Sequence, residues 1–390
     1  MEGWKEVRIG DLFDIKAGGD LQEDCYSPCV TNEARWAIYA NSLENKGLYG
    51  YTSRPRFHGN AVTITGRGDI GHAEYREEDF DAIVRLLVLL PKEYIDCRYI
   101  TYYLNSIVHF PKESTGVPQL TAPKVKRIKI NLPQSKAEQT AIANILAKVD
   151  EAIESVQNSI AKAERLKKSL MQNLLTGKMK PDGTFRTSDE FYIDEKFGKV
   201  PVGWEIKRID ELTRRKTEVI DPTKTKEIYD YIGLEHVVSN EFVRNGKGLS
   251  NETVALKVKF ERGDILYGKL RPYLNKVLIA DITGVGSTEF IVLEHNIYSN
   301  WIYLNFQLQR FLDFAKSMTA GTQHPRASWN DIRRYPICLP KDLQEMKLIA
   351  EKIISLESFK FSQLQETRRI ERLKKSLMQN LLTGKIRITI

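Results

Sequence analysis

The strongest constraint on this chain is a segment of 15 residues that occurs twice. Glu164 to Lys178 reads ERLKKSLMQNLLTGK, and Glu371 to Lys385 repeats it without a difference. A match of this length does not arise by chance, so we infer an internal duplication. Any fold proposed for the chain has to place two equivalent copies of this segment.

Each copy ends a segment that the hydrophobic pattern predicts to be one long helix. Apolar residues recur at steps of mostly three and four from Ile142 to Leu174, and again from Ile349 to Leu381. This is the heptad-like spacing of helices that pack on one another along one face. The second stripe is less regular, because the polar Lys360 and Thr367 occupy expected seam positions.

Both predicted helices carry start and stop signals. Ser135 and Asp342 each precede a glutamate by three residues, which predicts capping boxes, and Gly177 and Gly384 predict the helix ends. The first helix, Ser135 to Gly177, would extend about 65 Å at about 1.5 Å per residue. That length is close to two turns of B-DNA at about 34 Å each. A coiled coil that serves only as a spacer or a dimer surface fits the same pattern.

The rest of the chain forms two globules that begin and end alike. Gly3-Trp4 opens the first globule and Gly203-Trp204 the second, and they close on Leu132-Pro133 and Leu339-Pro340. Between these ends the two globules share little sequence. Each mixes short apolar runs typical of strands with helix-like runs, which predicts α/β or α+β domains.

This order predicts a pseudo-twofold arrangement with antiparallel helices, because the linker would lead from the far end of the first helix into the second globule. The polar linker has Pro181, Gly183 and few aliphatic residues, which predicts little regular structure. The predicted parts are a first domain over 1–133, a helix over 134–178, a linker over 179–202, a second domain over 203–340 and a second helix over 341–390.

Composition predicts a soluble protein of the cytoplasm. The chain is 42% hydrophobic and 28% charged, and no run approaches the roughly 20 apolar residues of a membrane span. Its first residues, MEGWKEVRIGDLF, lack the apolar core of a signal peptide. The four cysteines are too few and too scattered for a disulfide framework or a zinc site, so we expect free thiols and no metal.

The net charge of +8 suggests nucleic acid as a partner, but the charge is unevenly distributed. Residues 1–133 carry 17 basic against 18 acidic side chains, whereas residues 341–390 carry 11 against 6. The first domain is therefore not basic overall. Binding to DNA has to depend on local clusters of cations.

A glycine-rich segment gives the first candidate cluster. Gly66 to Gly71 matches G-x-G-x-x-G after a strand-like run, but no apolar helical stripe follows, so we reject a dinucleotide or S-adenosylmethionine site. Glycines let a backbone approach DNA closely, and arginine can pair bidentately with guanine. Arg67 and His72 are thus candidate DNA-binding residues, with a plain tight turn as the alternative.

The second domain has a basic cluster with interleaved aromatic residues. Gly263 to Lys269 resembles a P-loop, but Leu270 replaces the magnesium-binding serine or threonine, which excludes an ATPase site. Ordinary solvated charge is the alternative to DNA binding here. The candidate DNA-binding residues of this cluster are Tyr267, Lys269, Arg271, Tyr273, Asn275 and Lys276.

Two further loops precede the closing strands and are rich in small, hydrogen-bonding residues. They run from Ser114 to Thr121 and from Thr319 to Arg326. Gln119 and Gln323 could read adenine, and Arg326 could read guanine or neutralise a phosphate. Ordinary solvent loops would have a similar composition.

The identical repeats also include polar residues that packing between two helices does not by itself keep identical. One explanation is that the same partner binds twice, and the other is a recent duplication or a recombination site preserved at the DNA level. The candidate partner-binding residues are Lys167, Lys168, Gln172, Lys374, Lys375 and Gln379.

Several phrases of the sequence resemble the specificity subunit of type I restriction-modification systems. The order of two dissimilar globules and two repeated helices also matches, so the resemblance covers essentially the whole chain. The phrases are Phe197 to Pro201 before Gly203-Trp204, Gly263 to Leu266 before Lys269-x-Arg271-Pro272-Tyr273-Leu274, Leu132-Pro133 before Glu138-Gln139, and the endings L-x2-S-L-M-Q-x-L-L-T-G-K.

This resemblance implies a DNA-recognition subunit without catalytic activity. Each globule would be a target recognition domain for one half of a split site in double-stranded DNA, with no palindrome. The helices would set the separation and dock methyltransferase subunits, probably two. S-adenosylmethionine, ATP and magnesium would belong to those subunits and to restriction subunits.

The sequence itself contains no N/D/S-P-P-Y/F tetrapeptide, no paired-histidine metal spacing and no G-x-S-x-G elbow. A stand-alone DNA modification or cleavage enzyme is the main alternative. A coiled-coil adaptor that joins two protein ligands is a weaker one.

Overall fold

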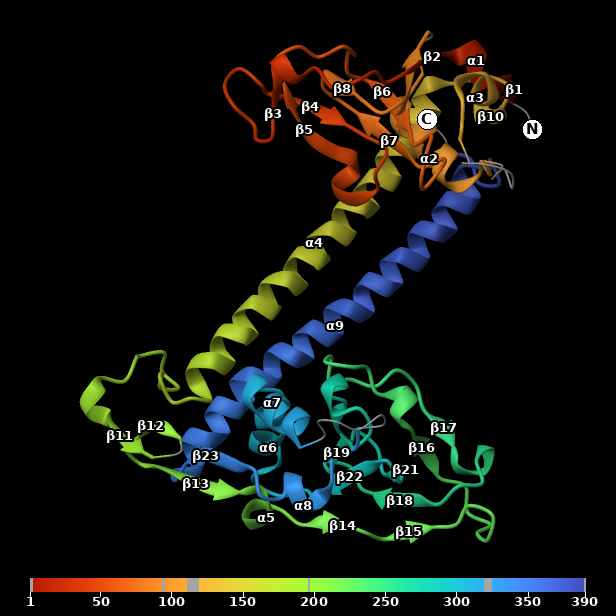
Figure 1. The fold of residues 1–390 in the computed structure, drawn as a ribbon. Helices are drawn as coiled ribbons and strands as arrows, with labels where there is room; N and C mark the ends of the chain where they lie inside the picture. The colour runs from red at the N-terminus through yellow and green to blue at the C-terminus, as the bar shows by residue number, and fades with distance from the viewer. Residues whose placement is uncertain (1–2, 93–94, 111–118, 196, 319–324, 389–390) are drawn as a thin grey trace. The chain divides into compact units, whose positions relative to one another are not determined.

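The computed structural model of the protein describes residues 3–92, 95–110, 119–195, 197–318 and 325–388. The chain divides into two compact units, Met1–Ser159 with Gln363–Ile390, and Ile160–Ser362. Each unit contains one globule, the first part of one long helix and the last part of the other (Figure 1). None of the helices in the described ranges combines the length and hydropathy that a membrane span needs.

The start and the end of each globule are paired strands. In the first globule, β1 (Trp4–Arg8) pairs antiparallel with β10 (Lys129–Pro133), and Trp4 lies opposite Pro133. In the second, β13 (Trp204–Arg208) pairs with β23 (Pro336–Pro340), and Trp204 lies opposite Pro340. The similar ends seen in the sequence are therefore bonded to each other, and each pair leads directly into a long helix.

Among its described residues, the first globule has two four-stranded sheets and the α-helices α1 to α3 (Figure 1). In the second sheet, β4 (Trp36–Tyr39) and β8 (Phe80–Ala82) pair parallel, and the other ladders are antiparallel. The first sheet, antiparallel throughout, has the order β2 (Phe13–Ala17), β9 (Leu87–Pro91), β6 (Ala61–Ile64) and β7 (Ala73–Arg76). The second has the order β3 (Tyr26–Ser27), β5 (Leu48–Thr52), β4 (Trp36–Tyr39) and β8 (Phe80–Ala82). The helices are α1 (Ile9–Leu12), α2 (Cys97–Ser106) and α3 (Ala122–Lys126).

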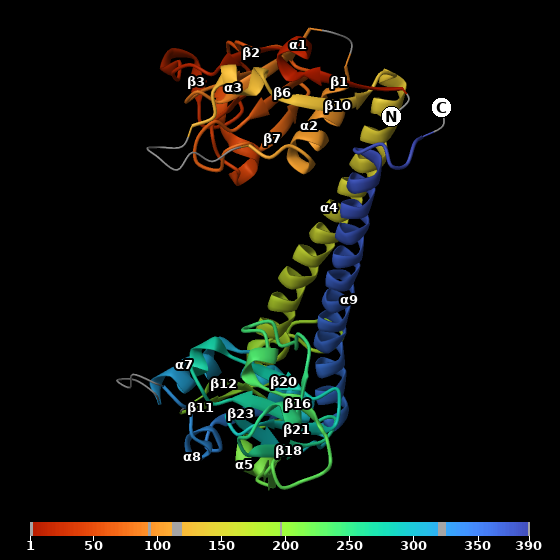
Figure 2. The same cartoon turned by 90° about the vertical axis from the view of Figure 1, so that its right-hand side faces the viewer.

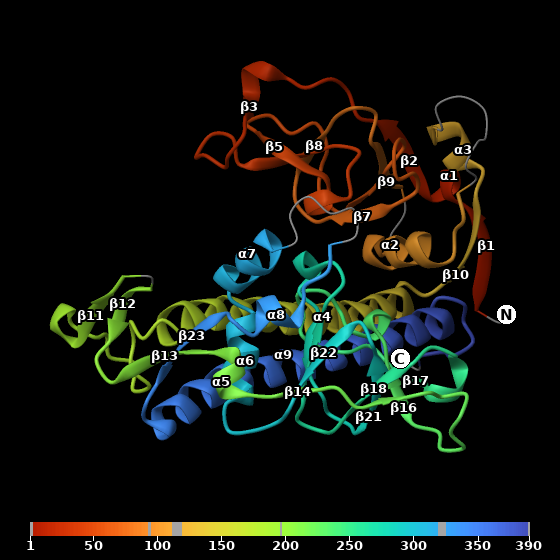
Figure 3. The same ribbon diagram turned by 60° about the horizontal axis from the view of Figure 1, so that its bottom comes forward.

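The second globule has a four-stranded and a five-stranded sheet (Figures 2 and 3). In the five-stranded sheet, β16 (Asp230–Ile232) pairs parallel with β21 (Gly284–Ser287). The first sheet has the order β14 (Arg215–Lys216), β22 (Phe290–Leu293), β19 (Ile265–Gly268) and β20 (Val277–Ile279). The second has the order β15 (Val219–Ile220), β18 (Lys257–Phe260), β21 (Gly284–Ser287), β16 (Asp230–Ile232) and β17 (Gly248–Leu249). The helices are α5 (Ile209–Leu212), α6 (Ser299–Phe306), α7 (Gln309–Ser317) and α8 (Trp329–Ile332).

The two interiors share one topology, although their sequences differ. The order β2-β9-β6-β7 in the first globule matches β14-β22-β19-β20 in the second, and each second sheet contains one parallel pair. The mixed α/β fold predicted from the sequence is confirmed. The shared strand order could not be recognised from the sequence, because a buried strand needs only apolar residues of suitable size and many different sequences provide them.

The linker is more regular than its composition predicted. Strands β11 (Phe191–Asp194) and β12 (Gly198–Pro201) form an antiparallel hairpin within it. Val200 is fully buried and packs into the core of the second unit together with Met179 and Phe197. The expectation of little regular structure was wrong, because backbone pairing and a few buried apolar side chains order an otherwise polar segment.

The long helices α4 (Lys136–Leu174) and α9 (Leu343–Leu381) begin and end near the predicted signals. The Ser135 hydroxyl accepts from the Glu138 N–H (3.4 Å), and the Asp342 carboxylate accepts from the Gln344 N–H (2.9 Å). Gly177 follows α4 at φ 67°, in the left-handed conformation that ends helices. Gly384 does the same after α9 at φ 69°.

The glutamates of the predicted capping boxes have a different use. Glu138 accepts from Arg387 (2.6 Å), which lies beyond the end of α9. Glu345 accepts from Arg186, which lies beyond the end of α4, and from the indole N–H of Trp204 (3.4 Å). In each unit, therefore, the segment that follows one long helix is bonded through an arginine to the first turn of the other long helix.

A cluster of one tyrosine, one acid and one lysine recurs in both units and holds α4 against α9. In the first unit, Asp150 of α4 accepts from the hydroxyl of Tyr102 in α2 (2.7 Å) and pairs with Lys374 of α9 (2.6 Å). In the second unit, Glu357 of α9 accepts from Tyr303 in α6 (2.9 Å) and pairs with Lys167 of α4 (2.5 Å). We call each of these sets a helix clamp.

The ion pairs also give the direction of the helices. Within the second unit, Glu164 pairs with Lys360 and Lys167 pairs with Glu357, so a step forward along α4 is a step backward along α9. The predicted antiparallel arrangement is confirmed there. Lys360, which interrupts the apolar stripe, is used for this pairing.

We predict that Lys167→Met lowers the free energy of unfolding of the second unit by about 2–3 kcal/mol, because it leaves the Glu357 carboxylate without its cation. The two side chains are only 18% and 17% exposed, so water replaces little of the lost interaction. Urea unfolding followed by tryptophan fluorescence measures the change. Lys168→Met, at the exposed neighbouring position, is the matched control and should change stability by less than about 0.5 kcal/mol. Equal midpoints for both variants would show that the clamp contributes nothing.

Candidate nucleic-acid interface

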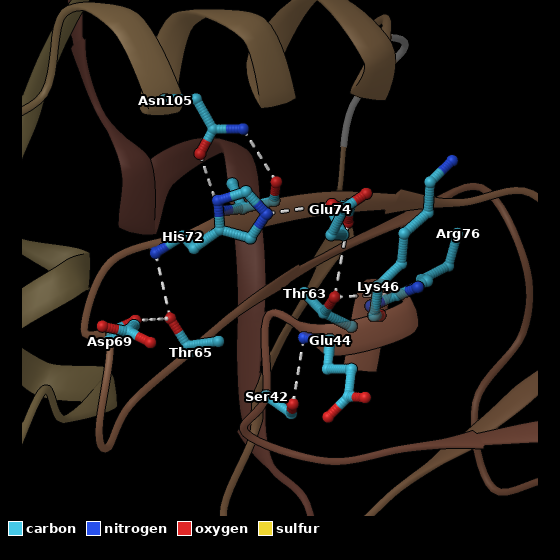
Figure 4. A network of polar contacts seen from close by, with 11 residues as sticks. Ser42, Glu44, Lys46, Thr63, Thr65, Asp69, His72, Glu74, Arg76 and Asn105 are labelled. Atoms are coloured by element: carbon cyan, nitrogen blue, oxygen red, sulfur yellow. Dashed lines mark hydrogen bonds and ion pairs between the residues drawn. The ribbon is translucent and has the colours of Figure 1, made fainter. Parts of the chain in front are cut away.

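The glycine-rich segment of the first domain is the loop of the β6–β7 hairpin, so no helix N-terminus follows it. The rejection of a dinucleotide site is thereby supported by the fold. Figure 4 shows how side chains shape the loop. The Thr65 hydroxyl donates to the carbonyl of Asp69 and accepts from the N–H of His72 (2.9 Å). His72 Nε2 lies 2.9 Å from Glu74 Oε1.

Three residues that the sequence did not single out fix the surroundings of this loop. Asn41 accepts from the N–H of Gly66 (2.7 Å). Asn105 of α2 bonds both backbone groups of Ala73 (2.8 Å each), where β7 begins. The buried Arg76 donates to Thr63 (3.0 Å) and to the carbonyl of Lys46 (2.8 Å), and burial lowers its pKa. Asparagine and arginine occur too often elsewhere for the sequence alone to have indicated these roles.

The corresponding loop of the second domain joins β19 to β20. Arg271 is exposed in the left-handed conformation (φ 51°), Tyr273 is 44% exposed and Lys269 is half-buried. Between β19 and β20 the chain forms only a short 3₁₀ helix, Pro272–Leu274, and not the α-helix that a P-loop leads into. These three side chains remain candidates for contact with DNA.

Three other candidates of this segment make contacts within the domain itself. Tyr267 is fully buried and packs on Phe306 and Phe311 in the core. Asn275 is buried and donates to the carbonyl of Phe306 (3.1 Å), and Lys276 donates to the carbonyl of Leu234 (2.6 Å). The sequence-based assignment of Tyr267 and Asn275 to DNA needs correction, because an aromatic or polar residue beside a loop can equally anchor that loop from inside the domain. Lys276 is partly exposed, and its contact with DNA stays a prediction.

The two candidate loops of each domain lie side by side. In the first domain, the N–H of Leu120 donates to the carbonyl of Gly66 (2.9 Å). In the second, the N–H of Ala327 donates to the carbonyl of Lys269 (2.9 Å), and the N–H of Arg271 to the carbonyl of Pro325 (2.8 Å). Residues more than 50 positions apart in sequence are thus bonded to each other in each domain.

Gln119 and Arg326 occupy equivalent places on these surfaces. Thr65 and Gly268 close the two hairpin loops with equivalent bonds to His72 and Lys276 (2.9 and 2.8 Å), so the next residues, Gly66 and Lys269, correspond. Leu120 is bonded to Gly66 and Ala327 to Lys269, and Gln119 and Arg326 are the residues directly before them. Gln323, the remaining candidate, lies outside the described residues.

A small cationic cluster surrounds Glu289 in the second domain. Arg326 pairs with Glu289 (3.1 Å), and the N–H of Lys269 donates to the Glu289 carbonyl (2.8 Å). Burial lowers the pKa of Lys269, Glu289 raises it, and Arg215 and Arg326 lower it. Lys269, Arg326 and Arg215 therefore act on one another near a single carboxylate, and the resulting excess of positive charge favours an anionic partner.

The repeated segment divides into inward and outward residues. Lys167 and Lys374 are bound in the helix clamps, so the packing of the helices itself accounts for their identity in the two repeats. Lys168, Gln172, Lys375 and Gln379 are exposed at equivalent positions. Of the six candidates for partner binding, these four offer exposed side chains.

Comparison with known proteins identifies the family. The family model of the type I restriction modification DNA specificity domain matches residues 1–165 and 201–375. The chain belongs to this family. It is a specificity subunit of the type I restriction-modification kind, as the sequence resemblance predicted.

Relatives of this family match over most of their length. The EcoDI specificity subunit of Escherichia coli is 23% identical, over 91% of this chain and 82% of its own. The MjaVIII specificity subunit of Methanocaldococcus jannaschii is 25% identical, over 99% and 94%. The crystal structure of an S subunit from M. genitalium has the same fold, with a TM-score of 0.68 over 97% of this chain and 96% of that one at 17% identity.

No group of histidine, cysteine or acidic side chains in the described part of the chain is arranged to hold a metal ion. The four cysteines are free, and three of them are buried. Arginine, lysine, glutamine and hydrogen-bonding loops are the chemical groups that the two surfaces offer. They suit contacts to phosphates and base edges.

We predict that Lys269→Ala with Arg271→Ala weakens DNA binding and lowers the slope of log affinity against log salt by about 1 for each lost phosphate contact. Titration of labelled duplex at several salt concentrations measures both quantities. Arg262→Ala removes an exposed cation at the opposite end of β19 and is the matched control. Unchanged affinity and slope in the double variant would return these residues to ordinary solvated charge.

Proposed function

We propose that each domain of this specificity subunit reads one half of an asymmetric, bipartite site in double-stranded DNA. The observation that carries this proposal is the repetition of one scaffold with different surface loops. Both domains join two loops by the same backbone bond, yet the loops present Arg67, His72 and Gln119 in one domain and Lys269, Arg271 and Arg326 in the other. Different side chains on equal scaffolds suit two unlike half-sites.

The helices α4 and α9 would set the distance between the half-sites. Each has 39 residues and would extend about 58 Å if straight. The clamps and the arginine–glutamate pairs hold the two helices together in both units. Such cross-links are needed if the helices are to fix a distance, because a single helix bends and rotates more easily than a cross-linked pair.

The chain would recognise DNA without catalysing a reaction. The described residues contain no set of metal ligands, and the sequence contains none of the catalytic motifs named above. Methylation, with S-adenosylmethionine, would belong to methyltransferase subunits, and ATP- and magnesium-dependent cleavage to restriction subunits. An adenine to be methylated would be flipped out of the duplex into a partner's pocket while this chain holds the DNA in register.

The exposed face of the repeat would bind two copies of the methyltransferase subunit. Lys168 and Gln172 lie one turn apart on α4, and Lys375 and Gln379 repeat this arrangement on α9. Identical exposed faces in two units offer two equivalent docking sites. A sequence kept identical by recombination at the DNA level is the competing explanation.

The half-site proposal predicts the result of a domain exchange. Replacing residues 203–340 by the second domain of a relative with a different target should change one half of the preferred site and leave the other half unchanged. Selection from a library of randomised duplexes, with the assembled complex, reads both halves at once. If both halves changed together, the assignment of one domain to one half would be refuted.

The docking proposal predicts the effect of charge reversal. Lys168→Glu with Lys375→Glu should remove both methyltransferase subunits from the complex, as measured by size-exclusion chromatography with mass determination. Lys148→Glu with Lys162→Glu reverses two exposed charges of α4 outside the repeat and should leave the complex intact. Retention of both subunits by the first variant would favour the recombination explanation.

A further inference from the structure

We infer that Gln119 and Arg326 are the corresponding base-reading residues of the two domains, that Gln119 selects adenine and Arg326 selects guanine, and that Glu289 positions Arg326. This inference rests on the proposed function and adds to it the residue and the base that decide one position in each half-site.

The first argument is that the backbone fixes where these side chains begin. Leu120 and Ala327 are both buried, and their N–H groups donate to the carbonyls of Gly66 and Lys269 (2.9 Å each). Arg326 also forms an antiparallel bridge with Leu270, and Pro325 accepts from Arg271 (2.8 Å). An anchored backbone loses little further conformational freedom on binding, so a side chain attached to it contacts a base from a fixed starting point.

The second argument is the difference between the two residues at one place in the scaffold. Phosphates are alike in every half-site, so phosphate contact at this place gives no reason for the residue to differ between the two domains. Gln119 is neutral and Arg326 is charged. Glutamine pairs bidentately with the N6 and N7 atoms of adenine, and arginine with the O6 and N7 atoms of guanine. The change from glutamine to arginine is the change expected between readers of the two purines.

The third argument is the position of Glu289. Its carboxylate pairs with one terminal nitrogen of Arg326 (3.1 Å), while the Arg326 side chain remains 61% exposed and keeps further N–H groups free to meet a base. A carboxylate here repels DNA phosphates, so it is an unsuitable residue for general DNA affinity. It does orient the planar guanidinium, which bidentate pairing requires.

The first domain has an arginine at the position that corresponds to Glu289. Extending the Ile64–Leu87 register by one residue places Leu86 opposite Thr65, as Phe290 lies opposite Gly268. Arg85 therefore corresponds to Glu289. The carboxylate thus occurs in the domain that has Arg326, and it is replaced by arginine in the domain that has Gln119.

The test is a single-residue exchange, read by selection from randomised duplexes with the assembled methyltransferase complex. Arg326→Gln should change a preferred guanine to adenine at one position of one half-site, with the discrimination between the two bases shifting by about 5- to 150-fold. The other half-site and the salt dependence of binding should stay as in the wild type. Gln119→Arg combined with Arg85→Glu should make the opposite change in the other half-site.

A positioning role for Glu289 has its own readout. Glu289→Ala should reduce discrimination only at the base that Arg326→Gln changes, while Glu289→Asp should restore part of it. A merely structural role would instead reduce affinity for all sequences. The half-site read by the first domain reports in each case that the complex is folded and bound.

Two results would overturn this inference alone, and a third would overturn the proposed function as well. If Arg326→Gln weakened binding to all sequences alike and lowered the salt slope by about 1, Arg326 would be a phosphate contact. If the selected site stayed unchanged, it would touch no DNA. If the wild-type complex selected no bipartite site at all, the proposed function itself would fail.

Discussion

The packing of α4 against α9 depends on a carboxylate shared between a tyrosine and a lysine, once in each unit. Apolar stripes bring two helices together but tolerate sliding by a heptad, because apolar contacts have little directionality. A mostly buried ion pair tolerates no such slip, since separating its members leaves a charge without a partner. The tyrosine belongs to the globule, so the same clamp also seats the globule on the helices.

The arginine–glutamate pairs extend this logic to the ends of the helices. Arg387 on Glu138 and Arg186 on Glu345 each tie the segment after one helix to the start of the other. In each unit, a non-covalent ion pair thereby joins the end of one long helix to the start of the other. Local capping would have used these glutamates within their own helices, but the tertiary pairing with an arginine is the stronger, charge-assisted interaction.

The candidate DNA surfaces follow from a second repetition, that of the hairpin loop bonded to the loop before the closing strand. The scaffold fixes which backbone positions face outward, and the side chains at those positions are free to differ. Gln119 and Arg326 illustrate this division, since equal bonds hold their neighbours while their own chemistry differs. A duplicated scaffold of this kind can change its target without changing its fold.

The sequence by itself determined the duplication, the two long helices, their caps and the family, because exact repeats, helical periodicity and local capping signals are written in neighbouring residues. It also indicated the loops around Arg67, Lys269, Gln119 and Arg326. Only the tertiary structure decided that Tyr267 and Asn275 are buried, that Lys167 and Lys374 belong to clamps, and that Glu289 lies beside Arg326. These facts depend on contacts between residues far apart in the chain, and no local pattern encodes which distant partner a charged or aromatic side chain will meet.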